Sequence, residues 1–179
     1  AIRYRYNKKK KQKFIKQRCF FQRNDVWWTR ITFYCKRYVR ESNKYYLDSL
    51  PTELNYEFNG VKLKFTHGSP NAINEYLFEN GTNTKNVMES LDSDILVCAH
   101  THIPSFKKFE NKTYINVGSI GKPKIGRPNI TYSIIEINEE GKSKVHFREL
   151  EYDKHKIIKD CQMLNFPNAL IESYKSGAE

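Results

Sequence analysis

Three histidines stand directly after two short strand-like segments, and their type and placement suit them to metal chemistry. Ile95 to Cys98 is an uncharged apolar run, which is typical of a buried strand, and His100 and His102 follow it. Val61 to Phe65 alternates apolar and basic residues, and His67 follows that segment. Neutral imidazole is a common ligand of transition metals. The two segments together therefore predict a metal site.

Turn signals close both histidine segments. Gly68, Ser69 and Pro70 follow the first histidine, and Pro104 follows the other two. Ligands of open α/β sheets bind outside the carboxyl ends of the strands. On an extended segment, residues two apart point the same way, so His100 and His102 are expected to face one metal or two neighbouring metals. The remaining histidines, at positions 146 and 155, are interpreted as ordinary surface or half-buried residues.

The elements that must position these histidines follow from hydrophobic periodicity and turn residues. Asn59-Gly60 between two alternating runs predicts a β-hairpin that ends at His67. A strand, a helix and a strand in succession predict a βαβ unit in a mixed sheet. The other expected elements are a helix at 42–50 capped by Ser42, a helix at 84–91, a hairpin at 106–117, strands at 130–137 and 143–152, and helices at 153–164 and 167–174.

A glycine-rich stretch, Asn116 to Gly121, follows the second hairpin. Gly118 and Gly121 free the backbone to approach an oxyanion, and Ser119 adds a hydroxyl group. Most glycine-rich stretches are only turns, so this signal gains weight from its neighbours rather than from its own composition.

Charge is distributed unevenly along the 179 residues. Residues 1–40 hold 14 lysines and arginines against one acidic residue, a net charge of +13, whereas residues 41–179 hold 17 basic and 19 acidic residues. Aromatic residues are interspersed through the basic arm, and this combination can grip a phosphate backbone and stack bases. A disordered arm and an out-of-frame N-terminus joined to a genuine domain are the alternative interpretations.

Composition excludes several classes of protein. The sequence has no run of 18 apolar residues and no secretory signal, which predicts no membrane contact. Four widely spaced cysteines without a C-x-x-C pair indicate a reduced, cytoplasmic chain rather than a disulfide scaffold or zinc ribbon. The sequence begins with Ala1 rather than methionine, so we expect it to be a fragment.

The three motifs taken together resemble the C-terminal signature set of the calcineurin-like metallophosphoesterases, in particular their small bacterial and archaeal phosphodiesterase branch. The resemblance covers about residues 41–179. It is carried by His67-Gly68-Ser69-Pro70, His100-Thr101-His102-Ile103-Pro104 and Asn116-Val117-Gly118-Ser119-Ile120-Gly121.

This resemblance implies a fold, a reaction and a set of site residues. The fold is the C-terminal half of a four-layer αββα sandwich, an α/β (α+β) class with a mixed sheet. The reaction is hydrolysis of phosphate esters by a hydroxide bridging two divalent ions, manganese first, with nickel, iron and zinc as alternatives. His67 and His100 would bind one ion and His102 the other. Gly68, Ser69, Thr101, Asn116, Gly118 and Ser119 would form the surrounding shell and phosphate loop.

The sequence also departs from the family pattern. The Asp-x-His, Gly-Asp and Gly-Asn-His motifs of the family's first half are absent, and with them the bridging aspartate and the acid/base histidine. Ala99 replaces the usual glycine, and Lys124 and Asn129 stand where arginines are common. Three imidazoles without carboxylates cannot bridge two dications. We therefore expect this chain alone to bind metal weakly and to hydrolyse little.

Three functions remain open from the sequence. The first is a metal-dependent phosphoesterase that has lost its N-terminal half. The second is a non-catalytic scaffold on the same fold, as in the retromer scaffold subunit, and the third is nucleic-acid binding through residues 1–40. Half a sandwich exposes a sheet edge and an apolar face, so we also expect homo-oligomers, aggregation, or cover by the aromatic arm.

Overall fold

The structure, a computed structural model, describes residues 37 and 39–178. It divides into two compact units, Ala1–Pro51 and Thr52–Glu179. The described part of the first unit contains one helix, α3, at Glu41–Asp48. The predicted cap at Ser42 is wrong, since Arg40 precedes the helix and no side chain caps it. All but three residues of the basic arm lie outside the described residues, so its expected role stays a prediction.

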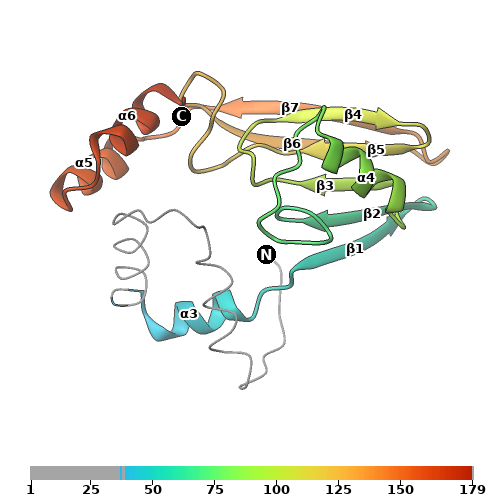
Figure 1. Cartoon of the computed structure of the whole chain (residues 1–179), viewed down its shortest axis with the longest axis horizontal. Helices are drawn as coiled ribbons and strands as arrows, with labels where there is room; N and C mark the ends of the chain where they lie inside the picture. The colour runs from blue at the N-terminus through green and yellow to red at the C-terminus, as the bar shows by residue number, and fades with distance from the viewer. Residues whose placement is uncertain (1–36, 38, 179) are drawn as a thin grey trace. The chain divides into compact units, whose positions relative to one another are not determined.

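The second unit contains all the described strands and three helices, in an order close to the predicted one (Figure 1). The elements are β1 Glu53–Phe58, β2 Val61–Thr66, α4 Thr82–Ser90, β3 Ile95–Cys98, β4 Ser105–Phe109, β5 Lys112–Asn116, β6 Ile130–Ile137, β7 Ser143–Leu150, α5 His155–Met163 and α6 Asn168–Ser176.

Five strands form one mixed sheet in the order β1-β2-β3-β5-β4, and β6 and β7 form a separate two-stranded sheet. β2, β3 and β5 run parallel to one another, and β1 and β4 are antiparallel strands at the two edges. Leu63 of β2 pairs with Ile95 of β3, and α4 provides the crossover between these strands. The predicted βαβ unit and mixed sheet are confirmed.

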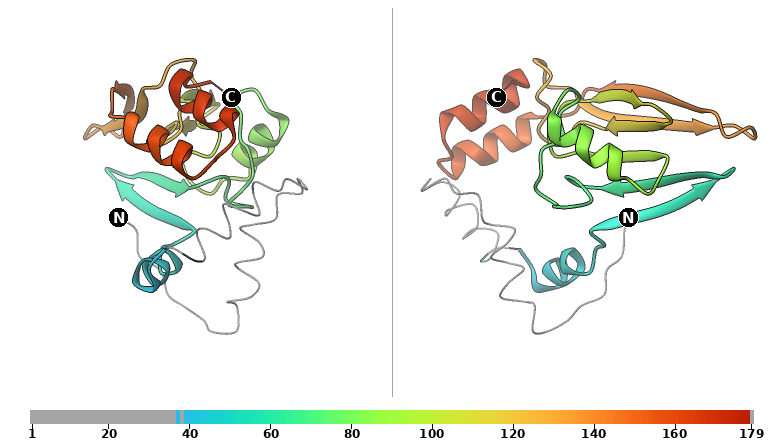
Figure 2. Two further views of the ribbon diagram at one scale, coloured as in Figure 1. Left: turned by 90° about the vertical axis from the view of Figure 1, so that its left-hand side faces the viewer. Right: turned by 45° about the vertical axis from the view of Figure 1, so that its right-hand side comes forward.

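The two faces of the five-stranded sheet are covered by different elements (Figure 2). On one face, Val87 and Met88 of α4 pack with Leu96 of β3 and the fully buried ring of Tyr114. On the other face, a second cluster joins central-strand residues to the inner face of the β6–β7 sheet: Leu63, Ile95, Val97 and Ile115 with Ile135, Ile137, Val145 and Phe147. The alternation of strand side chains therefore fills two cores, one on each face.

The first hairpin forms as predicted, with a register that runs from Glu53 opposite Thr66 to Phe58 opposite Val61. Asn59 and Gly60 both adopt positive φ, 50° and 76°, as a two-residue turn of this kind requires. The turn lies against the one between β6 and β7, because Asn59 Nδ2 donates to the carbonyl of Asn138 at 2.9 Å.

Helices α5 and α6 pack against each other around Ile158, Cys161 and Ile171. The Tyr152 hydroxyl, just before α5, donates to the carbonyl of Gly121 at 3.4 Å. The segment between β7 and α5 thus contacts the glycine-rich stretch. No described helix is long and apolar enough to cross a membrane.

Candidate metal centre

His67 and His100 lie close together because β2 and β3 are parallel neighbours whose carboxyl ends lie side by side. The N–H of Ala99 donates to the carbonyl of His67 at 3.0 Å, which extends the strand pairing by one step beyond β2 and β3. The backbone next to one histidine is therefore fixed to the backbone of the other. The carboxyl ends of the strands are where a ligand of an open α/β sheet is expected.

The two imidazole rings contact each other directly. His67 Nε2 lies 3.1 Å from His100 Nδ1, and the ring centroids are 4.9 Å apart. The ring of Tyr76 lies over His100, with 4.2 Å between centroids. A separation of 3.1 Å suits a hydrogen bond between the two nitrogens, and it also suits two nitrogens bound to one ion at about 2.0–2.1 Å each.

His100 is in an environment that favours the neutral, metal-binding form. Burial is the largest cause and lowers the pKa of His100, a hydrogen bond with the Asn74 backbone opposes it, and the nearby charge of Lys124 adds a smaller lowering. Its Nε2 atom is buried. Because Nδ1 is the nitrogen that faces His67, an ion shared by the two rings would bind Nδ1 rather than Nε2.

The backbone at the histidine pair differs from the expected extended segment. His100 and His102 have φ values of 65° and 64°, in the left-handed region that residues other than glycine occupy in only a few per cent of cases. Between them, the buried Thr101 hydroxyl exchanges hydrogen bonds with the N–H and carbonyl of Ile103, at 3.2 and 3.3 Å. Two left-handed residues make a tight turn, so the expectation of an extended segment was wrong.

His102 is oriented by the glycine-rich stretch rather than by the other two histidines. Its Nδ1 lies 2.5 Å from the carbonyl oxygen of Lys122, and the Lys124 N–H donates to the His102 carbonyl at 3.2 Å. A carbonyl only accepts, so Nδ1 is the protonated nitrogen and the lone pair of the neutral ring is on Nε2. A hydrogen bond from the ring nitrogen that does not bind the metal, such as this one from Nδ1, fixes the tautomer of metal-binding histidines.

Asn116, the last residue of β5, contacts the turn that carries His100 and His102. It is completely buried, and its Nδ2 donates to the carbonyl of Ala99 at 2.6 Å and to the sulfur of Cys98 at 3.6 Å. Its Oδ1 accepts from the N–H of Gly118 at 3.0 Å. One side chain therefore holds the residue before His100 and the start of the glycine-rich stretch together.

Gly118 and Ser119 are held by packing and by their own hydrogen bonds. Gly118 has a φ of 79°, and a Cβ there would lie 2.0 Å from the Thr131 hydroxyl oxygen and 2.8 Å from a carbon of Pro104. The Ser119 N–H donates to the Thr131 hydroxyl at 2.9 Å, and the Ser119 hydroxyl accepts from the Lys122 N–H at 3.0 Å. Ser119 thus supports the residue whose carbonyl binds His102.

Gly68 and Ser69 shape the loop after His67. A Cβ on Gly68 would lie under 3 Å from three carbonyl oxygens of that loop, so only glycine fits. The buried Ser69 hydroxyl donates to the carboxylate of Glu75 and accepts from the N–H of Ala72 at 3.0 Å. This loop carries Tyr76 to its place over His100.

The described residues fit a metal ion in part. His67 Nε2 and His100 Nδ1 lie at a separation that suits one shared ion. Within the same residues, however, no group of three or more His, Cys, Asp or Glu side chains is placed to hold an ion. The geometry provides a pair of ligands rather than a complete set, and His102 stands apart on the adjacent turn.

Comparison with known proteins decides the family. The calcineurin-like phosphoesterase superfamily domain matches residues 23–140. This chain belongs to the calcineurin-like phosphoesterase superfamily. The resemblance inferred from the histidine motifs is therefore confirmed, and so is the α/β fold with a mixed sheet. The division of the chain at residue 40 stays a prediction.

Several relatives of this phosphoesterase-family chain come from archaea and bacteria. It is 29% identical over 154 residues to the uncharacterized protein MJ0912 of Methanocaldococcus jannaschii, and the match covers 76% of the chain and 60% of the relative. Among solved structures, it is similar to the metallophosphoesterase from Sphaerobacter thermophilus, with a TM-score of 0.72, 20% identity and coverage of 89% and 73% of the two chains.

The hypothetical protein PH1004 from Pyrococcus horikoshii is another structural relative, with a TM-score of 0.75 and 20% identity. The match covers 93% of this chain and 65% of PH1004. The chain thus spans less than two thirds of both PH1004 and MJ0912. At these identities the solved structures establish the fold.

Three residues of the centre were not predicted from the sequence. Tyr76, Lys122 and Thr131 contact His100, His102 and the glycine-rich stretch respectively. The aromatic character of Tyr76 is its only signal in the sequence, and it does not distinguish a ring that covers a histidine from an ordinary core residue. Every residue has a backbone carbonyl, so the sequence does not indicate that the carbonyl of Lys122 contacts His102.

Proposed function

We propose that this chain carries the histidine ligands of a metal-dependent phosphoesterase, with His67 and His100 binding one divalent ion and His102 contributing to a second. The contact between His67 Nε2 and His100 Nδ1, at the carboxyl ends of two parallel strands, is the observation that carries the proposal. Membership of the calcineurin-like phosphoesterase superfamily supports the reaction class.

Each residue of the centre has a defined task in this proposal. The lowered pKa of His100 keeps its ring neutral and able to bind a cation. The Lys122 carbonyl holds His102 in the tautomer with the lone pair on Nε2. Asn116 fixes the turn that carries both rings. Divalent ions held there would supply Lewis acidity and an activated water for attack on a phosphate ester.

The incomplete ligand set leads to a specific expectation for the chain by itself. Two neighbouring imidazoles lack the carboxylates that balance and bridge two dications, and no described acidic side chain completes a group of three. We propose that further ligands come from outside the described residues. The chain alone is then a weak metal binder and a poor hydrolase, with manganese as the first ion to examine and nickel, iron and zinc as alternatives.

Metal binding tests the proposal independently of activity. Isothermal titration calorimetry with Mn²⁺ and Zn²⁺ compares the unaltered chain with His67→Ala and His100→Ala, and His155→Ala on α5 is the matched control. We expect weak binding that falls by at least about tenfold in the first two variants and is unchanged in the control. Equal affinity in all variants would overturn the ligand assignment.

Hydrolysis tests the reaction class. The substrate is bis(p-nitrophenyl) phosphate, assayed with and without Mn²⁺. We expect slow, metal-dependent turnover that His67→Ala and His100→Ala abolish. Rapid manganese-dependent turnover would contradict the incomplete site. Turnover that persists in both variants would contradict the centre itself.

A further inference from the structure

β1 is the edge strand of the five-stranded sheet, and no described strand pairs with its outer side (Figure 1). It pairs with β2 without interruption over six residues, so it has no bulge. Its sequence, ELNYEF, contains neither lysine nor proline. Natural proteins use bulges, prolines and charged side chains, lysine above all, to prevent an edge strand from pairing with another chain. β1 has no bulge, proline or lysine, and its charged residues are Glu53 and Glu57.

The opposite edge strand, β4, is protected in the usual way. It contains Lys107 and Lys108 within five residues. Lys107 Nζ donates to Asn80 at 2.8 Å and lies 5.2 Å from the centre of the Phe109 ring. The two edges of one sheet therefore differ, and only β1 is suited to a partner strand.

The two faces of β1 are sharply different in polarity. Leu54, Tyr56 and Phe58 point to the β6–β7 side of the sheet, and Tyr56 and Phe58 remain 49% and 53% exposed there. Their rings stack at 6.0 Å, and Tyr56 contacts Phe65 edge-on at 5.9 Å. This apolar stripe is already ordered, so covering it requires little further loss of side-chain freedom.

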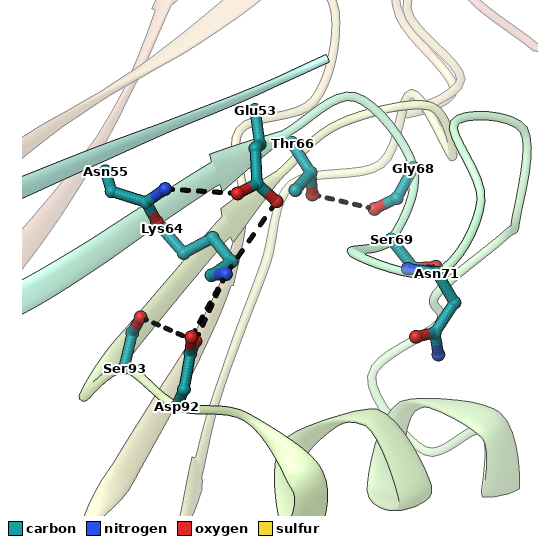
Figure 3. Close-up of polar contacts among 9 residues, drawn as sticks. All are labelled: Glu53, Asn55, Lys64, Thr66, Gly68, Ser69, Asn71, Asp92 and Ser93. Carbon is teal, nitrogen blue, oxygen red and sulfur yellow. Dashed lines mark hydrogen bonds and ion pairs between the residues drawn. The ribbon is translucent and has the colours of Figure 1, made fainter.

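The other face of β1 is polar and internally paired, as Figure 3 shows. Lys64 lies between Asp92 and Glu53, at 3.1 and 3.7 Å. Asn55 Nδ2 donates to Glu53 at 3.1 Å. Glu57 is exposed at the far end of this face. The carboxylate of Glu57 and the amide of Asn55 are thus the groups that a neighbouring strand would meet.

We propose that β1 pairs with β1 of a second copy of this chain in an antiparallel, two-fold symmetric arrangement centred on Tyr56. Residues directly opposite each other in such a pair must point to the same face of the sheet. The two-fold axis therefore passes between two copies of the same residue and not between two different positions. Centred on Tyr56, the pairing places Leu54 opposite Phe58, Tyr56 opposite Tyr56, and Asn55 opposite Glu57.

The neighbouring register, centred on Asn55, is less favourable. It places Glu53 opposite Glu57 twice, and like charges directly opposite are destabilising. The Tyr56 register instead joins the two apolar stripes into one and gives each Glu57 carboxylate an amide partner. For pairing with a second copy, charge and polarity together therefore favour the Tyr56 register.

The backbone is compatible with this arrangement. Phe58 and Val61 flank the two-residue turn and form its closing hydrogen-bonded pair, so alternation leaves the N–H and carbonyl groups of Glu53, Asn55 and Glu57 facing outward. In the Tyr56 register, Asn55 and Glu57 of opposite copies exchange both hydrogen bonds. The two five-stranded sheets would then form one continuous sheet across the dimer.

Cysteine cross-linking tests the register in the full chain. Cys19 and Cys35 are first changed to serine, and Cys98 and Cys161 are buried. Directly opposite residues of a non-hydrogen-bonded pair have Cα atoms about 4.5 Å apart, which a disulfide can bridge. In a glutathione redox buffer, Tyr56→Cys is expected to form a disulfide-linked dimer and Asn55→Cys is not. Preferential linkage of Asn55→Cys would overturn the register.

Charge substitutions at Asn55 test the interface without altering the core. Opposite Glu57 of the second copy, Asn55→Glu is expected to weaken the dimer by about threefold or more, and Asn55→Lys to strengthen it. In the rejected register, Asn55 lies opposite itself and both variants would weaken the dimer. Sedimentation velocity over a concentration series measures both, with circular dichroism to confirm folding.

Tyr56→Lys and Phe106→Lys form a matched pair on the two edges. We expect the first variant to be monomeric and the second, on β4, to dimerise like the unaltered chain. Dissociation caused by Phe106→Lys, or a monomer at every concentration of the unaltered chain, would overturn the proposal. β1 carries none of the three histidines, so this outcome is separate from that of the proposed function.

Discussion

We call the end of the sheet where β2 and β3 finish the histidine end. There, His100 and His102 have positive φ, in the left-handed region. At the opposite end of the strands, the turn end, positive φ occurs at Asn59, Gly60 and Gly141, and also at Glu110 in the turn between β4 and β5. Glycine and asparagine adopt this conformation at little cost, whereas other residues lose about 1–2 kcal/mol. The histidine end therefore places two such residues within one turn, whereas the turn end has one, Glu110, among glycine and asparagine.

The contacts that hold the two ends also differ in burial. At the turn end, the bond from Asn59 to the carbonyl of Asn138 is exposed to solvent. At the histidine end, Asn116 is completely buried, and the Nε2 atom of His100 is buried as well. Strained backbone and buried polar groups are expected where a fold positions reactive groups. The comparison thus supports the histidine end as the site.

Thiol labelling gives the largest expected contrast between the ends. Burial raises the pKa of the Cys98 thiol, at the histidine end, to about 12. The thiolate fraction near neutral pH is then about a thousandfold below that of an ordinary cysteine. An introduced Glu140→Cys at the exposed turn end should react at an ordinary rate. Mass spectrometry after brief N-ethylmaleimide treatment measures both, and comparable labelling would show that the histidine end opens freely.

Gly118→Ala is expected to have the next largest effect, a loss of folding stability. The added Cβ would meet Thr131 and Pro104, and the positive φ adds strain, so stability should fall by about 3 kcal/mol or more. Gly121→Ala is the matched control, because no atom lies within 4 Å of its Cβ. Urea unfolding followed by circular dichroism compares them. Equal midpoints would mean that the glycine-rich stretch is not held by this contact.

Asn116→Ala should cost about 2–4 kcal/mol, since it leaves the Ala99 carbonyl and the Gly118 N–H buried without partners. Asn116→Asp keeps the acceptor for Gly118 but places a carboxylate oxygen against the Ala99 carbonyl at a completely buried position, so it should cost at least as much. The same urea assay ranks the three proteins. An Asn116→Ala midpoint close to that of the unaltered chain would show that this side chain does not fix the turn that carries His100 and His102.

Asn59→Ala is expected to cause the smallest loss of folding stability. It removes one exposed hydrogen bond and places alanine at a φ of 50°, for a loss of about 1 kcal/mol. Asn59→Gly keeps the backbone freedom and should cost no more than about half as much. A loss at Asn59 as large as that at Asn116 would erase the difference between the two ends.

The strands and helices of the second unit were predictable because their signals are local. Asn59-Gly60 between alternating runs is sufficient to place the first hairpin and its register. The uncharged run at β3 predicts a strand that is buried on both faces. Parallel neighbours with histidine at their carboxyl ends were then enough to predict that His67 and His100 come together.

The detailed geometry of the site was not predictable in the same way. The left-handed turn at His100 and His102 depends on contacts with Asn116 and Lys122, which are distant in the sequence. Glycine at 118 was interpreted as room for an oxyanion, whereas its packing against Thr131 and Pro104 alone requires glycine. Such requirements arise between elements and cannot be seen within one segment.

The position of β3 between two parallel partners has a consequence for the order of folding. Among the described strands, the pairs β1–β2, β4–β5 and β6–β7 are hairpins of adjacent segments, which close in microseconds. β3 instead joins partners that are distant along the chain on both sides. Non-local parallel pairing is slow, so β3 docks late. The turn bearing His100 and His102 follows β3, so metal affinity should appear only in the last kinetic phase of refolding.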